Sequence, residues 1–176
     1  SLNYNGWITF RMRAMLVSFA SYNLWLDWRI TGYHLAQTFT DYEPGIHYSQ
    51  LQMQSGVTGI NTVRIYNPIK QSYDHDPHGI FIKKWVPELK NISETWIHEP
   101  WKMELSTQRT TKCIIGRNYP TPIVDHTISI KKARSRIAEI IKKDGYKDKS
   151  KVVLNKMGSR KRTKTSKNIN PQLQLL

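Results

Sequence analysis

The stretch DYEPGIHYSQLQMQSG, residues 41–56, is polar and rich in turn-forming residues, yet it carries several large side chains. Asp41 and Glu43 lie two residues apart, a Pro-Gly pair follows, and His47 precedes a run in which Gln and Ser alternate with larger residues. A linker rarely holds so many large side chains, and a core strand rarely holds so many Gln and Ser residues. The stretch therefore predicts an ordered polar loop that holds a ligand or a buried charge.

The preceding segment, GWITFRMRAMLVSFASYNLWLDWR (6–29), predicts one long helix over residues 7–30. Thr9 is a weak start signal, and Gly32 is a stop signal. Large side chains recur at the three- and four-residue intervals of one helix face: Met12, Met15, Leu16, Phe19, Tyr22, Asn23 and Leu26. We expect this face to be buried.

Two arginines near the start of this helix, Arg11 and Arg13, are two residues apart and therefore point to different sides. Arg13 lies beside the apolar face, where a charged group requires a partner. Asp41 and Glu43 of the polar loop are the candidate partners, whereas Arg11 is expected to face solvent. The alternative is that both arginines are ordinary solvated side chains.

The rest of the chain predicts an all-α fold with long ordered loops. Turn signals such as Pro-Gly and Asn-Pro make residues 41–78 mostly irregular. Further helices are expected over 33–40, 79–86, 127–143 and 148–157. The helix over 127–143 is amphipathic, with these residues on one side: Ile130, Ala133, Ile137, Ile140 and Ile141. The organisation is a main unit, basic helices and a disordered basic tail: 1–126, 127–157 and 158–176.

The positive charge is concentrated in the C-terminal part. The chain of 176 residues has a net charge of +14, and residues 131–176 carry 15 Lys or Arg against 3 Asp or Glu. Such a segment is typical of nucleic-acid contact, and equally of a solubilising terminus or a short nuclear-type signal. No apolar run approaches the roughly 20 residues of a membrane span, and no signal peptide is recognisable. An intracellular, cytoplasmic location, including the nucleoid or nucleus, is expected.

Other residues with possible chemistry give weak signals. His47 fits a metal ligand, a proton donor or a hydrogen-bonded structural residue. DHDPH (74–78) matches no known ligand spacing, so it predicts an exposed turn and no metal site. Cys113 is the single cysteine, which excludes an internal disulfide, and it is expected to be a small buried residue. The sequence has no phosphate-binding glycine loop and no nucleophile elbow.

The order of several motifs points further. The helix segment at 6–29 and the loop at 41–56 are followed by RIYNP, DHDPHGIFIKKWVPEL, IHEPW and YPTPIVDH. In this order they resemble the flavin-binding domain of the DNA photolyase/cryptochrome family, from about residue 5 to about residue 136. The resemblance implies an all-helical domain that binds FAD. In photolyases the reduced flavin, excited by blue light, donates an electron to a pyrimidine dimer flipped out of DNA.

The resemblance assigns roles at the cofactor. Asp41 matches the acid that faces the flavin and pairs with the helix arginine, here Arg13. Glu43 stands where the family usually has a second acid, and Phe10 also lies at the cofactor. His47 occupies the position beside flavin N5, where photolyases commonly carry Asn.

The resemblance also assigns contacts to damaged DNA. Trp7 matches a tryptophan that stacks on the lesion and joins Arg13, Asp41 and His47 in the implied catalytic set. Arg11 and Arg64 are implied DNA contacts. Met53 is a third, although it replaces a lesion-stacking tryptophan.

Electron transfer departs from the family pattern. Trp28 matches the middle member of the usual tryptophan triad, but Leu51 replaces the member next to the flavin. This route is therefore broken or rerouted, with Tyr48 and Trp25 as candidate relays.

The sequence lacks the segments that match the family's N-terminal antenna domain and the region that holds the FAD diphosphate. They would lie elsewhere in a parent chain or in a separate subunit. Three functions are therefore considered. They are a photolyase (a carbon–carbon lyase acting on DNA), a cryptochrome-type photoreceptor without repair, and a fragment that does not bind flavin alone.

Overall fold

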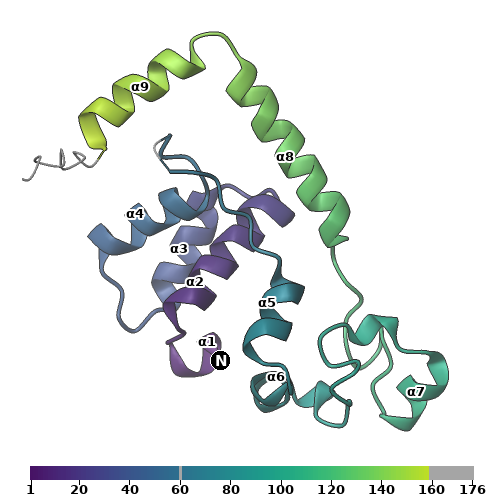
Figure 1. Ribbon diagram of the computed structural model, residues 1–176. Coiled ribbons are helices and arrows are strands. Elements are labelled where there is room, and N and C mark those ends of the chain that lie inside the picture. Colours follow the sequence, from purple (N-terminus) through teal and green to yellow (C-terminus); the bar gives the residue numbers. More distant parts are fainter. Residues whose placement is uncertain (60, 159–176) are drawn as a thin grey trace, which may run out of the picture.

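A computed structural model describes residues 1–59 and 61–158 (Figure 1). Across these residues the chain is helical and contains no strand, only an isolated bridge between Ile115 and Tyr119, which confirms the all-α class. The α-helices are α1 Leu2–Asn5, α2 Phe10–Ser18, α3 Trp28–Thr38, α4 Pro44–Gln54, α5 Pro68–His75, α6 Ile80–Trp85, α7 Leu105–Thr110, α8 His126–Lys142 and α9 Tyr146–Met157. The π-helix η1 spans Phe19–Asn23, and the 3₁₀ turns η2 and η3 span Pro87–Leu89 and Pro100–Lys102.

The single helix predicted over 7–30 is divided in the structure. α2 begins after Thr9, whose side chain accepts a hydrogen bond from a backbone N–H of the first turn, and it passes directly into η1. The chain then turns through Trp25, which has a φ of 55°, and Asp27 caps the start of α3. One long helix and a separate helix over 33–40 were wrong predictions, because Asp27 starts a new helix, Trp28–Thr38, that joins the end of the first segment to most of the second.

The bundle of α2, α3 and α4 encloses the first core. Its buried side chains are Ile8, Val17, Leu35, Phe39 and Leu51. Gly32 is not a stop signal but a buried position inside α3, where an added Cβ would lie 2.6 Å from Cδ1 of Leu51. The close approach of α3 to α4 therefore depends on Gly32 having no side chain.

The apolar face predicted for the segment 7–30 is only partly buried, since Leu16 and Leu26 are exposed.

The prediction that residues 41–78 are irregular was wrong. They contain α4 and α5, and each of these helices has a proline at its first turn. Glu43 caps α4 by accepting hydrogen bonds from Gly45 N (3.1 Å) and Ile46 N (2.7 Å), and Asn67 caps α5. Proline is favoured at the first position of a helix, so the signals interpreted as turns mark helix starts.

A second core lies in the segment from α6 to residue 119. It buries Leu89, Ile92, Ile97, Met103 and Cys113. The helix predicted over 79–86 is present as α6, and the cysteine is buried as expected. The DHDPH motif covers the end of α5 and the turn before α6. There Asp76 accepts hydrogen bonds from Phe81 N and Ile82 N at the start of α6.

The C-terminal helices form an arch beside the bundle (Figure 1). The predicted helices over 127–143 and 148–157 are present as α8 and α9. Ile130 and Ala133 are buried against Tyr22, whereas Ile140 and Ile141 remain partly exposed. Thus only the first half of the predicted apolar face is covered.

A polar contact reinforces the junction between α8 and the bundle. The amide Nδ2 of Asn23 lies 2.9 Å from both Nδ1 of His126 and Oγ of Ser129. Ser150 of α9 donates a hydrogen bond to the carbonyl of Gly59 (3.0 Å). The tail predicted to be disordered, residues 158–176, lies outside the described residues except for Gly158. None of the described helices is long and apolar enough to cross a membrane.

Candidate functional site

A pocket opens between α2, α3 and α4, at the polar stretch 41–56. All five predicted flavin-site residues lie in its wall: Phe10, Arg13, Asp41, Glu43 and His47. The remaining lining residues are Ala14, Val17, Leu35, Phe39, Tyr42, Ile46, Gln50, Leu51 and Gln54. The fold thus brings a guanidinium, two carboxylates and an imidazole together on a mostly apolar surface.

Arg13 is held from three sides. Its Nε donates a hydrogen bond to the carbonyl of Ile8 (3.0 Å), and its Nη2 lies 2.9 Å from Oδ2 of Asp41. The guanidinium carbon lies 4.3 Å from the ring centre of Phe39, which is a cation–π distance. The hydrogen bond from Arg13 lowers the pKa of the Asp41 carboxyl from its usual value of 3.8. The predicted pairing of Arg13 with an acid of the polar stretch is confirmed, and the acid is Asp41.

Glu43 has a different structural role from Asp41. Both of its carboxylate oxygens accept hydrogen bonds from backbone N–H groups at the start of α4. It lines the pocket but forms no ion pair with Arg13 in the described structure. The alternative in which Glu43 is the partner of Arg13 is therefore not observed.

His47 is buried, and its ring position is fixed. Its Nε2 lies 2.8 Å from the carbonyl oxygen of Gly32. A carbonyl oxygen only accepts hydrogen bonds, so Nε2 carries a proton and Nδ1 is the basic nitrogen of the neutral ring. The rings of Phe39, Tyr42 and Tyr48 meet the imidazole edge-on. Within the described residues no group of three or more His, Cys, Asp or Glu side chains is arranged to hold a metal.

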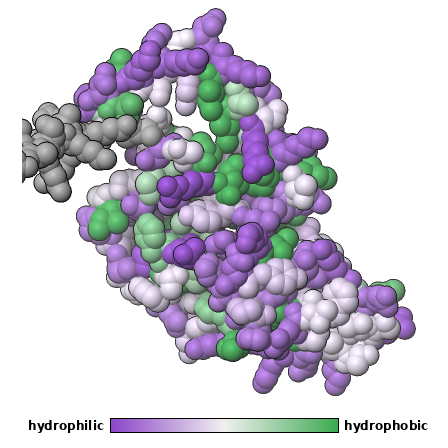
Figure 2. Space-filling model, viewed as in Figure 1, coloured by the Kyte–Doolittle hydropathy of each residue, from purple (hydrophilic) through white to green (hydrophobic). Residues whose placement is uncertain are grey.

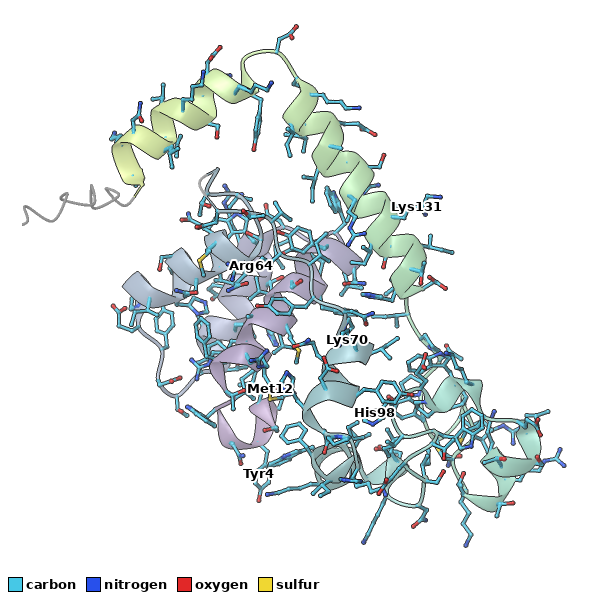
Figure 3. The ribbon with its side chains drawn as sticks, viewed as in Figure 1. Tyr4, Met12, Arg64, Lys70, His98 and Lys131 are labelled. Carbon is cyan, nitrogen blue, oxygen red and sulfur yellow. The ribbon has the colours of Figure 1, made fainter. Side chains whose placement is uncertain are left out.

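The predicted DNA residues lie outside this pocket. Trp7 is about half exposed, and Arg11 donates a hydrogen bond to Gln71 of α5 (3.4 Å). Met53 and Arg64 share a separate small hollow beyond the end of α4, and Figure 3 labels Arg64. Trp28, the predicted electron carrier, packs against the bundle core and does not line the pocket.

Several pocket residues were missed by sequence reasoning. Ile46, Gln50 and Gln54 of α4 line the pocket beside the predicted His47 and Leu51, and they were not foreseen. Their spacing of three and four residues is that of one helix face, but it was hidden because the stretch was interpreted as a loop. Phe39, which supports the guanidinium of Arg13, had no recognisable signal in the sequence.

The fold and pocket define an all-helical ligand-binding domain, and comparisons with known proteins identify its family. Residues 1–139 match the family described as the FAD binding domain of DNA photolyase. The chain therefore belongs to this family, which confirms the predicted family and its cofactor, FAD.

Named relatives include both photolyases and cryptochromes. The chain is 36% identical over 132 residues to the deoxyribodipyrimidine photo-lyase of Alkalihalophilus pseudofirmus, covering 74% of this chain and 28% of that protein. It is 31% identical over 140 residues to cryptochrome DASH of Synechocystis, covering 79% and 28%. The crystal structure of a Synechocystis cryptochrome has a TM-score of 0.73 at 31% identity, with 76% of this chain and 28% of that chain covered. The chain thus spans under a third of the length of these relatives.

The pocket residues fit the ring end of FAD. The isoalloxazine is a flat ring system with an apolar edge and a polar edge rich in hydrogen-bonding atoms. The apolar wall formed by Phe10, Phe39 and Ile46 suits the apolar edge of the ring system. On the polar side, Arg13 supplies N–H donors, and Oε1 of Gln50 is buried without a hydrogen-bond partner in the described structure. Such an unpaired atom fits a site whose polar groups are completed by a ligand.

Proposed function

We propose that this chain is part of a flavoprotein that repairs pyrimidine dimers in DNA with blue light. The observation that carries the proposal is the Arg13–Asp41 pair, which places a fixed cation in the wall of an FAD-type pocket. FAD, when bound, supplies the light-driven electron transfer. The chain's own residues bind the cofactor, set the local field and position protons.

Arg13 and Asp41 have complementary roles in this proposal. A guanidinium in a partly apolar pocket favours negative charge on a neighbouring ligand, because the local dielectric is lower than that of water. Asp41 keeps the guanidinium in place with one short hydrogen bond, and the ring of Phe39 packs against the guanidinium. The remaining N–H groups of Arg13 are the candidates for contact with the flavin.

His47 supplies a hydrogen-bonding group at the same pocket. Because the carbonyl of Gly32 holds the Nε2 proton, the neutral ring can accept a hydrogen bond only at Nδ1. The Asn that is common at this position in photolyases offers both a donor and an acceptor.

DNA is the proposed partner. Trp7 and Phe10 are exposed by 52% and 60%, which leaves aromatic surface for stacking on a flipped base. Arg11 and Arg64 are exposed cations that suit phosphate contacts.

A cryptochrome-type photoreceptor without repair is the second candidate. It is favoured by Leu51, which is 2% exposed and offers no aromatic relay next to the pocket. Met53 likewise offers no aromatic surface for lesion stacking. The relatives named cryptochrome support this candidate as well.

The test begins with flavin retention. The chain is incubated with FAD and desalted, and its visible absorption is recorded. It is then irradiated with an oligonucleotide that contains a cyclobutane dimer, with an identical dark sample as control. Dimer loss only under light supports the photolyase, and a light-induced flavin change without dimer loss supports the photoreceptor. A retained flavin that does not respond to light contradicts both. Loss of flavin on desalting would contradict the proposal for the chain alone. It would favour a fragment that binds FAD only together with the remaining part of the FAD site.

A further inference from the structure

The arch of α8 and α9 carries an unusual density of cations. Residues 126–157 contain ten Lys or Arg and only three Asp or Glu. Figure 2 shows hydrophilic side chains along the outside of this arch and hydrophobic ones between the arch and the body. The family match ends at residue 139, so the end of α8 and all of α9 lie beyond it. The flavin-type pocket includes no residue of the arch.

The inner side of α8 is already used for packing. Ile130 and Ala133 are buried against Tyr22, with Ile137 beside them, and His126 is bonded to Asn23. The helix is therefore attached to the bundle by its apolar face. Its opposite face remains available to a partner.

That outer face presents a row of unpaired cations. Lys131 and Lys142 lie on this side of α8, because a step of eleven residues returns close to the same direction, and Arg134 lies at its edge, near His126. All three are exposed, and Figure 3 shows Lys131 pointing away from the body. Among the described residues of the arch, the only ion pair joins Lys151 to Asp148 at 4.0 Å.

We propose that the outer face of α8, continued by α9, binds the phosphate backbone of duplex DNA without sequence preference. From Lys131 to Lys142 the helix rises about 16 Å, a length that corresponds to roughly five phosphates along one strand. Unpaired Lys and Arg side chains are the groups that release counterions from DNA on binding. The proposal rests on the proposed function only in taking DNA as the partner.

A lipid surface is the competing partner, and packing disfavours it. An amphipathic helix binds a membrane through its apolar face, which α8 uses inside the protein. Val152, Leu154 and Met157 of α9 are exposed, so an anionic membrane belongs among the outcomes of the test.

The test measures binding of the full chain to an undamaged duplex of about 25 base pairs, a length that spans more than two helical turns. Fluorescence anisotropy is recorded in the dark, without flavin, between 50 and 200 mM salt, a range over which phosphate contacts give a clear slope. The variant K131Q/R134Q/K142Q is compared with K90Q/K112Q/R117Q. The second set removes the same number of exposed positive charges from the segment that runs from the end of η2 past α7.

The first variant is expected to lower the slope of log affinity against log salt by about two to three, at roughly 0.9 for each phosphate contact. The control variant should change it by less than one. Equal slopes for both variants, or no change in either, would overturn the proposal. Binding of the wild type to vesicles with anionic lipid but not to the duplex would also overturn it. Circular dichroism of both variants checks that the helices persist.

This outcome is separate from that of the light experiment. Dark binding to undamaged DNA requires neither flavin nor repair, so DNA binding by the arch can be confirmed even when the repair proposal fails. Conversely, K131Q/R134Q/K142Q could retain light-dependent dimer loss with an unchanged salt slope. This result would support repair and overturn the proposal that the arch binds DNA.

Discussion

The guanidinium of Arg13 and the carboxylate of Asp41 are 28 residues apart in the chain and 2.9 Å apart in space. The contact joins α2 to the turn before α4, and it is the point at which the pocket acquires a fixed charge. Asp41 is 48% exposed at its side chain, so the pair is open to solvent on one side. Its main consequence is therefore to position Arg13, since exposed ion pairs contribute little to stability.

Acid should weaken this contact in a defined direction. The pKa of Asp41 is lowered in the folded chain by its hydrogen bond with Arg13, so the unfolded chain takes up a proton first as the pH falls. The stabilisation is complete above about pH 4 and is lost as the pH falls through the lower folded pKa. Denaturant unfolding of the wild type and Asp41→Asn between pH 5 and 2.5 should show a smaller loss of stability in the variant. Asp27 and Glu94 also have lowered pKa values and remain in both proteins, so they cancel in the comparison. Parallel pH curves would contradict the contribution of Asp41.

Glu43 should act through its backbone hydrogen bonds and not through its charge. Replacing it with Ala removes the cap of α4 and should lower the free energy of unfolding by about 1 kcal/mol. Glu43→Asn supplies another capping side chain and should retain most of that stability. The measurement is chemical denaturation of both variants at neutral pH. If Asn proves as destabilising as Ala, the capping role is wrong.

Gly32 should reverse the usual effect of a helical glycine. Gly→Ala inside a helix normally stabilises by roughly 0.5–1 kcal/mol. Here the new Cβ would lie 2.6 Å from Cδ1 of Leu51, which is 2% exposed and has little room to move. Gly32→Ala should therefore destabilise by about 1–3 kcal/mol.

The matched test of this contact is a double-mutant cycle. Leu51→Ala alone should cost about 2–5 kcal/mol. In the Gly32→Ala background it should cost clearly less, because it also relieves the clash. A stabilising Gly32→Ala, or strict additivity of the two changes, would show that the helices do not approach as described.

His126 should make the docking of α8 sensitive to mild acid. Burial lowers its pKa from the usual 6.5, and Nδ1 accepts a hydrogen bond from Asn23 only in the neutral ring. Below about pH 6.5 the unfolded chain binds the proton more readily, so the stability of the fold decreases with falling pH. His126→Gln should remove this part of the decrease between about pH 7 and 5. Thermal unfolding across this range measures it, and an unchanged pH dependence in the variant would contradict it.

The sequence predicted the fold class and the helices whose ends carry clear signals. Pro87 ends α6, and α8 begins at His126 after its cap Asp125, one residue before the predicted start. The errors have a common physical origin, since the same residue types serve turns and helix starts. Pro44 and Pro68 were interpreted as loop markers although each occupies a first helical turn, and glutamate is an uncommon cap.

The site was predicted in part for a related reason. Arg13 needed a partner because of its place beside an apolar face, which left Asp41 and Glu43 as candidates, and the family resemblance selected Asp41. Phe39 and Gln50 could not be found in that way, because their roles depend on how α3 and α4 pack. Tertiary contacts of this kind leave no local periodic signal once the helix itself has been missed.

The most direct measurement of the central claim is a titration of the chain with lumiflavin, the isoalloxazine ring without its ribityl and diphosphate parts. Chemical shifts from NMR locate the ring without requiring a diphosphate site. We expect saturable shifts at Arg13, Phe39 and His47, with weaker binding in Arg13→Gln and unchanged binding in the exposed control Arg117→Gln. Shifts that are absent, that lie outside the α2–α4 pocket, or that are equally strong in Arg13→Gln would contradict this claim.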